Sequence, residues 1–263
     1  MTTRIARLDS RALIRVTGPD ARPFLHNLLT QDVETLAPGQ LRFGGLLSPP
    51  GRLLFDLFLL GLEDGVLLDV AADRRDALLQ RLAMYRLRAQ VTVEADGGAV
   101  FAAWDGEAPG FIPDPRTPGL GGRRYGYGDV GTNAAEDDWQ AHRLAVGVPD
   151  PAADAFPDKT YPIEADFDLL NGIDFQKGCF VGQETTSRMK RRGAIRNRML
   201  PLAFDGPAPA FGAEVLNGEL RAGEVLSGRD GAAMALMRLD RIEGDLTVDG
   251  RPVTVRRPDW APL

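Results

Sequence analysis

Short, nearly continuous apolar runs separated by turn residues dominate the first hundred positions of the chain. Apolar runs of roughly four to eight residues, bounded by glycine, proline and aspartate, are typical of buried strands. The runs at 42–47 and 53–60 are joined by a Ser-Pro-Pro-Gly-Arg loop and predict a buried β-hairpin or two neighbouring strands. Together the pattern predicts strands at 12–16, 42–47, 53–60, 66–70, 91–94 and 99–102.

Amphipathic segments between and after these runs predict helices. Apolar residues at helical spacing cover about 21–29, where Asp20 is placed to cap the helix, and Asp73 is placed to cap a second such segment that follows it. A third segment contains Trp139 and ends near Gly147. Strands mixed with amphipathic helices indicate an α+β fold.

The density of glycine and proline divides the chain into parts. The segment 105–123 is rich in both and predicts a crossing between units, and 152–162 predicts a loop. Beyond residue 200, short β-like runs between Gly and Asp turns predict a small β-barrel or sandwich of about 60 residues. We therefore expect two α+β parts and a C-terminal β-barrel, at 1–105, 120–198 and 199–263.

Composition narrows the classes of function. The chain has 263 residues, of which 44% are hydrophobic, and no apolar run approaches about 18 residues, so we expect a soluble, cytoplasmic protein outside the membrane. A single cysteine excludes an internal disulfide. With only His26 and His142 besides, a self-contained zinc site or iron–sulfur cluster is not expected, because such sites use three or four ligands. Any cluster would have to be shared with a partner.

Charge is distributed unevenly along the chain. The formal net charge is −6, yet the segment 177–198 carries seven basic residues against Glu184 alone. Such a run is commonly a solvated helix face, and it also suits the attraction of a carboxylate, a phosphate or an acidic partner. The acidic total and the lack of interleaved aromatic residues argue against nucleic acid as a partner.

The cysteine lies in a turn flanked by glycines. Residues 177–184 read Lys-Gly-Cys-Phe-Val-Gly-Gln-Glu, and Gly178 and Gly182 allow a positive φ or a close backbone approach around Cys179. The following residues, 183–192, have an acid near the start, bases near the end and a glycine after them, which predicts a helix.

Two interpretations of the thiol follow from this turn. A cysteine just ahead of a helix start and near Lys177 lies in positive potential that is expected to favour the thiolate, which makes Cys179 and Lys177 the candidate reactive residues. The alternative is that Cys179 is a small buried hydrophobic residue, as lone cysteines commonly are.

These residues resemble the folate-binding YgfZ proteins, relatives of the glycine-cleavage T-protein (aminomethyltransferase). The most specific part is 177–184, which matches the family signature Lys-Gly-Cys-aromatic-x-Gly-Gln-Glu with Phe180 as the aromatic residue. The resemblance covers nearly the whole chain and continues at Arg188, Gly193 and Arg198. Weaker support comes from short fragments at 18–21, 24–25, 32, 51–52, 56, 114–116 and 162–164.

The resemblance implies an α+β, aminomethyltransferase-like fold of three parts in a ring. It places a tetrahydrofolate pocket at the centre, the cysteine turn at its edge and a small β-barrel at the C-terminus. In such a pocket Glu164 would accept paired N–H donors from a pterin, and Arg188 would attract the glutamate tail. The residues expected to bind tetrahydrofolate or a derivative are Glu164, Arg188, Gly178, Gly182, Gln183, Glu184 and Asp56.

The family resemblance also implies a function. It indicates an accessory protein for assembly or repair of iron–sulfur clusters that acts through Cys179 as a nucleophile or transient metal ligand, with folate and iron–sulfur client or carrier proteins as partners. One alternative is a folate-dependent aminomethyltransferase or demethylase using Asp56, although Phe55 stands where glycine-cleavage enzymes carry a second aspartate. Another is a non-catalytic interaction module whose Arg191 and Arg192 dock an acidic carrier protein.

Overall fold

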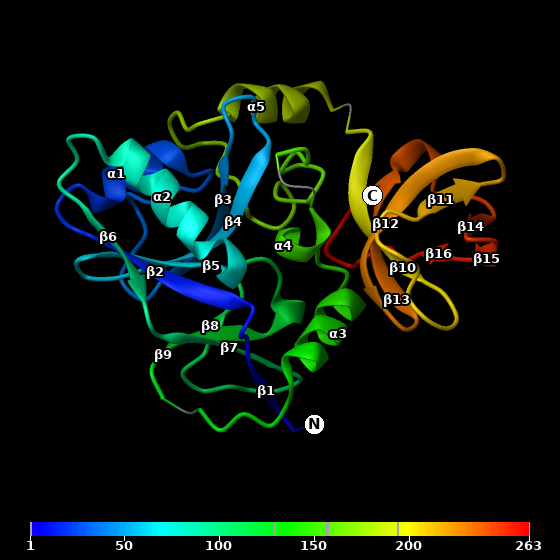
Figure 1. Cartoon of the computed structure of the whole chain (residues 1–263), viewed down its shortest axis with the longest axis horizontal. Helices are drawn as coiled ribbons and strands as arrows, with labels where there is room; N and C mark the ends of the chain where they lie inside the picture. The colour runs from blue at the N-terminus through cyan, green and yellow to red at the C-terminus, as the bar shows by residue number, and fades with distance from the viewer. Residues whose placement is uncertain (1, 129, 156–157, 194, 263) are drawn as a thin grey trace.

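In the part of the chain that the structure describes, three β-sheets and five α-helices surround a central segment of turns (Figure 1). The computed structural model describes residues 2–128, 130–155, 158–193 and 195–262. Within these ranges no helix has both the length and the apolar character needed to span a membrane. The expected α+β class is confirmed, since two sheets carry helices and the third forms the C-terminal barrel.

The first sheet is antiparallel and has five strands in the order β3-β4-β5-β2-β6. These are β2 (Arg11–Thr17), β3 (Leu41–Leu47), β4 (Leu53–Gly61), β5 (Gly65–Ala71) and β6 (Thr92–Asp96). Helices α1 (Ala21–Leu28) and α2 (Arg75–Arg86) pack their apolar side chains on one face. All the strands expected in this region form, and β3 and β4 make the expected buried hairpin.

Two helix caps differ from the expectation. The Asp20 carboxylate accepts the Gln90 amide instead of an amide of α1, which ties the helix start to the loop between α2 and β6. Asp73 lies in a 3-10 turn, and Arg74 takes the cap position of α2. At α1 a distant amide takes the carboxylate that would cap the helix, and at α2 a local turn takes the capping residue.

The other face of the first sheet meets a second core. Side chains alternate along β4, so Phe55 packs toward the helices while Phe58 joins the opposite core, on the side where Asp56 also lies. There the Phe43 ring lies 5.1 Å from Phe58 and 4.7 Å from Phe167, which belongs to the central turns at 161–172.

The second sheet has the strand order β1-β7-β9-β8. Its strands are β1 (Arg4–Arg7), β7 (Ala99–Trp104), β8 (Ile112–Pro113) and β9 (Gly122–Gly126), and helix α3 (Glu136–Val146) packs beside it through Trp139. The segment 105–123 was expected to be a crossing without strands, which is wrong for β8 and the start of β9. β8 is only the dipeptide Ile-Pro, and β9 consists of glycine, arginine and tyrosine, so neither has the apolar run of a buried strand.

The C-terminal part forms the expected small β-barrel. Its strands follow the order β15-β14-β11-β12-β13-β10-β16. They are β10 (Asn197–Ala203), β11 (Glu214–Asn217), β12 (Leu220–Arg229), β13 (Ala232–Arg238), β14 (Leu246–Val248), β15 (Arg251–Pro252) and β16 (Thr254–Val255). Their inward side chains make a separate apolar core.

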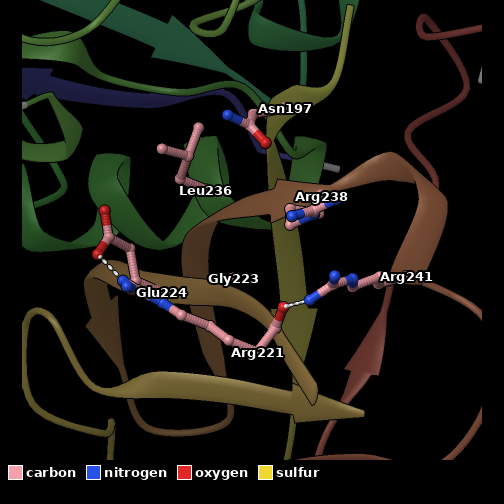
Figure 2. A pocket seen from close by; sticks show the side chains of 7 residues that line it. All are labelled: Asn197, Arg221, Gly223, Glu224, Leu236, Arg238 and Arg241. Atoms are coloured by element: carbon pink, nitrogen blue, oxygen red, sulfur yellow. Dashed lines mark hydrogen bonds and ion pairs between the residues drawn. The ribbon is translucent and has the colours of Figure 1, made fainter.

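The barrel carries a surface cavity of about 350 Å³ lined by three arginines (Figure 2). Arg221 donates to Glu224 at 2.6 Å, Arg241 donates to the Arg221 carbonyl at 2.6 Å, and Arg238 pairs with Asp240 at 2.9 Å. Each guanidinium therefore already has an acceptor from the barrel itself, a carboxylate for Arg221 and Arg238 and a main-chain carbonyl for Arg241.

Buried ion pairs join the barrel to the rest of the chain. Arg143 of α3 donates to Asp154 at 2.9 Å, and Asp154, at the end of the short helix α4 (Pro151–Asp154), accepts the Ser227 amide of the barrel. Arg198 of β10 reaches the central turns, where it binds Asp166 at 2.7 Å. The loop expected at 152–162 therefore begins inside α4, a helix too short to show a periodic pattern.

Candidate functional site

Cys179 is exposed on the turn that precedes helix α5 (Gln183–Arg192). The expected helix forms with the expected ends, between Gly182 at φ 80° and Gly193 at φ 61°. The thiol lies outside the apolar cores, so the alternative of a buried hydrophobic cysteine is wrong. We call the segment Asp174–Cys179 the cysteine turn.

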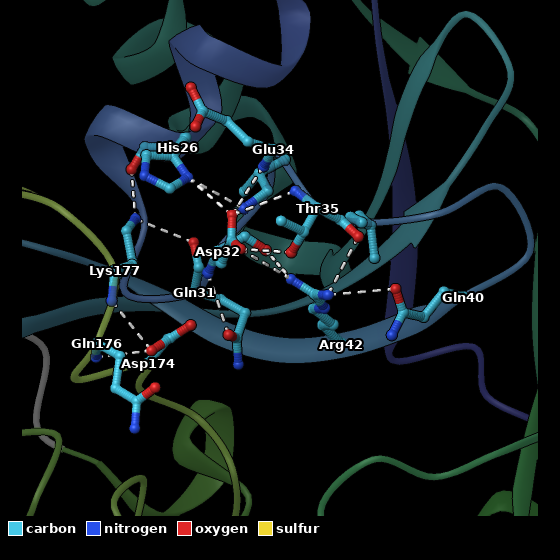
Figure 3. Close-up of polar contacts among 12 residues, drawn as sticks. His26, Gln31, Asp32, Glu34, Thr35, Gln40, Arg42, Asp174, Gln176 and Lys177 are labelled. Carbon is cyan, nitrogen blue, oxygen red and sulfur yellow. Dashed lines mark hydrogen bonds and ion pairs between the residues drawn. The ribbon is translucent and has the colours of Figure 1, made fainter.

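Lys177 fixes this turn to the end of α1. Its ammonium group donates to the main-chain carbonyls of His26, Leu29 (2.7 Å) and Gln31 (3.0 Å), which lie where the negative end of the α1 dipole gathers (Figure 3). Burial lowers the pKa of Lys177 to about 8. Among the contacts of the described residues, none joins the Lys177 ammonium to the Cys179 thiol. Stabilisation of a thiolate by Lys177 therefore stays a prediction, whereas the hydrogen bonds that anchor the turn are observed.

A second set of bonds holds the same turn against the same segment. The Asp174 amide donates to the Thr30 carbonyl at 2.9 Å, and the Thr30 hydroxyl donates to the Gly172 carbonyl at 2.6 Å. The Asp174 carboxylate accepts the amides of Gln176 and Lys177, which closes the turn on itself (Figure 3). The backbone that carries Cys179 is thus fixed on its N-terminal side.

Glycines fix the C-terminal side. A β-carbon at Gly182 would lie 2.7 Å from the Ser48 carbonyl oxygen and 2.9 Å from the Gly51 Cα. The start of α5 therefore contacts the loop of the β3–β4 hairpin backbone to backbone, an approach that a side chain at Gly182 would prevent. The expected use of Gly182, a positive φ with close packing, is confirmed.

A histidine lies beside the cysteine turn. The Nδ1 atom of His26 is 3.0 Å from an Asp32 carboxylate oxygen, and a β-carbon at Gly178 would lie 4.0 Å from Nε2. Burial raises the pKa of Asp32, but hydrogen bonds from Thr35 and the Glu34 amide outweigh it, so this pKa lies below its usual value. Sequence reasoning missed this pair, because His26 and Asp32 are far from Cys179 along the chain.

Basic side chains follow the thiol along α5. Arg188 and Lys190 are exposed, and neither they nor Arg191 has an ion-pair partner within the described ranges. The Lys190 ammonium lies 3.5 Å from the Phe175 ring centroid. The side chain of Arg192, also expected in this basic face, lies outside the described residues. An open groove of about 630 Å³ is lined by Phe175, Gln183, Glu184, Ser187, Lys190 and Arg191.

The space between the first two sheets and α3 is filled by charged side chains. Five buried ion pairs at 2.6–3.1 Å link three arginines with three aspartates, and we call this set the central ion-pair cluster: Arg11, Asp56, Asp69, Asp114, Arg116 and Arg123. Arg123 also stacks over the Phe58 ring at 3.7 Å. Burial raises the pKa of Asp114, but Arg116 and Arg123 outweigh it and hold this pKa at about 2.

Two of the residues expected to contact folate, Asp56 and Glu164, make their contacts away from α5. Asp56 is buried against Arg11, beside a remaining cavity of about 10 Å³ that offers room for no more than a water molecule. Glu164 accepts the Tyr161 amide at 2.9 Å and the Asn197 side chain, while Arg188 lies on the exposed face of α5. Gly178, Gly182, Gln183, Glu184 and Arg188 lie together on the cysteine turn and α5, apart from Asp56 and Glu164, and their role in binding tetrahydrofolate stays a prediction.

Comparisons with known proteins agree on fold and family. Residues 196–263 match the model described as CAF17, C-terminal beta-barrel domain. The Homo sapiens protein named iron-sulfur cluster assembly factor IBA57, mitochondrial, is 34% identical over 97% of this chain and 85% of its own length, and the Mus musculus protein of that name is 32% identical over the same shares.

A solved structure, glycine cleavage system aminomethyltransferase T from Bartonella henselae, superposes with a TM-score of 0.80 at 20% identity, over 98% of this chain and 86% of that one. This likeness confirms the aminomethyltransferase-like fold. The names of the two mammalian relatives support the cluster-assembly part of the sequence resemblance but not the YgfZ family name itself. Both relatives are mitochondrial, and the cytoplasmic location expected for this chain stays a prediction.

Proposed function

Because this chain belongs to the IBA57 family of iron–sulfur cluster assembly factors, we propose that it helps to assemble or repair such clusters through the thiol of Cys179. The observation that carries the proposal is the exposed Cys179 on a turn fixed at both ends, by Lys177 on the carbonyls after α1 and by Gly182 on the β3–β4 loop. A thiolate is the soft ligand that iron–sulfur clusters use. Because the backbone of the turn is already fixed, little conformational entropy is lost in positioning the thiol when a partner binds.

The surroundings of the thiol suit a protein partner. The basic side chains of α5 follow Cys179 directly and lack acidic partners among the described residues, so their field attracts an acidic surface and favours rapid encounter. We assign this face to an iron–sulfur carrier or client protein. The cluster is the cargo, and Cys179 binds one of its irons while the partner still holds the rest.

The test is restoration of a [4Fe–4S] enzyme, such as aconitase, in cells that lack this protein. Wild type is expected to restore the activity, and Cys179→Ser is expected to lose at least about nine-tenths of that gain, because a hydroxyl is a poor iron ligand. Cys179 is exposed, so thermal unfolding of the variant should match wild type. Full restoration by Cys179→Ser would remove the thiol from the function.

Two further readouts belong to the same experiment. Co-purification of the cluster carrier should weaken as salt is raised, because exposed charges are screened. It should survive Cys179→Ser if docking precedes the iron contact, which separates loss of the partner from loss of the ligand.

Folate binding is separate from the proposed cluster-assembly function and needs its own test. The sequence resemblance implies tetrahydrofolate, but the central ion-pair cluster leaves about 10 Å³ where a drug-sized ligand needs about 300 Å³ or more. We therefore expect calorimetric titration with tetrahydrofolate to show no saturable binding that depends on Asp56 or Glu164. A saturable isotherm that Glu164→Ala abolishes would contradict this and restore the pterin role of that carboxylate.

The same geometry weighs against the transferase alternative. Asp56 is 6% exposed and its carboxylate is held by Arg11 at 2.9 Å. A general acid or base must come within hydrogen-bond reach of the substrate. In this arrangement a substrate has no space beside Asp56, so the cluster-assembly function is the one the described residues support best.

A further inference from the structure

The loop that carries Cys179 and α5 is closed at its base by buried ion pairs. Arg198, the second residue of β10, binds Asp166 and Asp168 of the central turns, so the intervening chain contains both the cysteine turn and α5. We call Asp166, Asp168 and Arg198 the base clamp. We propose that the base clamp is proton-dependent: it is closed while Asp166 is protonated and loosens when Asp166 ionises. This inference concerns regulation of the same site, and its meaning for cluster assembly rests on the proposed function.

The base clamp is buried and brings three charged side chains together. The Arg198 guanidinium lies 2.9 and 2.8 Å from the two carboxylate oxygens of Asp168 and 2.7 Å from Oδ1 of Asp166. The side chains of Arg198, Asp168 and Asp166 are 6%, 8% and 1% exposed. Beside them the Met199 amide donates to the Glu164 carbonyl at 2.8 Å. Opening the loop at its base therefore requires these bonds to break together.

One guanidinium cannot balance the charge of two carboxylates. Asp168 contacts both terminal nitrogens of Arg198, a bidentate pair that satisfies its charge. Asp166 contacts only one of these nitrogens, and in the described part of the chain its Oδ2 has no hydrogen-bond partner. A buried oxygen that is ionised and unpartnered is costly, whereas a protonated carboxyl avoids that charge. The geometry therefore favours a proton on Asp166.

The electrostatic surroundings of Asp166 agree with a protonated carboxyl. Burial raises the pKa of Asp166 to about 8, Asp168 adds to the increase, and Arg198 offsets it only in part. Among the described residues, the charged groups that act on Asp166 are these two, Arg198 from β10 and Asp168 from the central turns. The nearby Glu164 carboxylate is held instead by a main-chain amide of the same turns and by Asn197. At neutral pH the Asp166 carboxyl is therefore mostly uncharged.

Ionisation of Asp166 couples opening of the clamp to pH. A solvated aspartate has a pKa of about 3.9, so opening the clamp above that pH releases the proton that Asp166 holds in the closed state. Between about pH 5 and 8, each unit of pH therefore raises the equilibrium constant for opening by up to tenfold, and above this window the dependence ends. Lys177, whose pKa is lowered to about 8, stays protonated in both states below that pH and adds no slope there.

Amide hydrogen exchange of the full-length protein tests the clamp. The reporters are the amides of Met199, Leu169 and Leu170, whose main-chain hydrogen bonds lie beside it. In wild type we expect their protection factors, corrected for the intrinsic effect of pH on exchange, to fall by up to about tenfold per unit between pH 6 and 8. Asp166→Asn keeps a neutral acceptor for the guanidinium and cannot ionise, so its protection factors should be independent of pH over this range.

A surface pair supplies the matched control. Asp240 also pairs with an arginine, at 2.9 Å, but both side chains are exposed on the barrel. Asp240→Asn should therefore keep the wild-type dependence of protection on pH at the three reporter amides. The same dependence in Asp166→Asn as in wild type would overturn the proposal.

The carboxyl ¹³C signal of Asp166 gives a readout in the wild-type protein alone. We expect its titration midpoint near pH 8, and a midpoint near pH 4, the ordinary value for aspartate, would overturn the proposal. This result is independent of the assay in cells. If Cys179→Ser restores the enzyme in cells while the midpoint lies near 8, the proposed function fails and the clamp stands. If the midpoint lies near 4 while Cys179→Ser loses restoration, the clamp fails and the proposed function stands.

Discussion

Replacing Asp69 with asparagine is expected to lower the free energy of unfolding by about 3–5 kcal/mol. Asp69 is 1% exposed and accepts from Arg11 at 2.6 Å, Arg123 at 2.9 Å and Tyr125 at 3.1 Å. Asparagine removes the charge and one acceptor, so two buried guanidinium groups lose their shared partner. Because whole domains are stable by only about 5–15 kcal/mol, this one change removes a large share of the total.

Urea unfolding followed by tryptophan fluorescence measures the effect, since Trp104 and Trp139 lie in the core beside α3. The matched control is Asp240→Asn, which also breaks an arginine–aspartate pair but at the surface of the barrel, where Arg238 and Asp240 are solvated. The urea concentration at the unfolding midpoint of Asp240→Asn should stay close to that of wild type. Equal shifts for the two variants would mean that the central ion-pair cluster contributes no more than a surface pair.

Replacing Lys177 with methionine is expected to reduce the restoration of a [4Fe–4S] enzyme by about 100-fold, the order of loss that follows when a reacting group is displaced by about 1 Å. Methionine keeps the apolar stem but leaves the carbonyls of Leu29 and Gln31 without their donor. The cysteine turn then keeps only its Asp174 and glycine contacts, and Cys179 samples positions away from the partner.

Hydrogen exchange locates the cause. Amides of residues 174–182 should exchange faster in Lys177→Met, while those of the β-barrel should not change. Lys159→Met is the control, because Lys159 is an exposed lysine on a different loop. A fully active Lys177→Met protein with faster exchange would show that the anchoring contacts are structural only.

The sequence pattern predicted those helices and strands that are determined by their own residues and the turns beside them. The hairpin of β3 and β4 follows from two apolar runs around a Pro/Gly loop, and α5 follows from an acid at its start, bases at its end and Gly193. β9 escaped prediction because it consists of glycine, arginine and tyrosine, and its partners on β7 and β8, not its own composition, make it a strand. Tertiary pairing overrode propensity there.

In the candidate site too, features with a local cause could be predicted from the sequence, and features that depend on distant residues could not. Residues 177–184 indicated a turn around Cys179 and residues 183–192 indicated the helix, while the sequence left open whether the thiol is exposed. The acceptors of Lys177 could not, because the carbonyls of Leu29 and Gln31 lie more than 140 positions earlier in the chain. The charges of Arg11 and Asp69 likewise gave no sign of burial in the sequence, since a charged residue at a strand position ordinarily faces water.

The exposure of Cys179 also sets how the protein responds to oxidants. Since the chain has no other cysteine, a sulfenic acid formed there has no internal thiol with which to condense. It can be capped only by a second molecule, such as glutathione, a thiol on the carrier or another copy of the chain. If Cys179 binds the cluster as proposed, the reducing capacity of the surroundings governs the fraction of active protein, and oxidation would inactivate the protein reversibly while glutathione remains available.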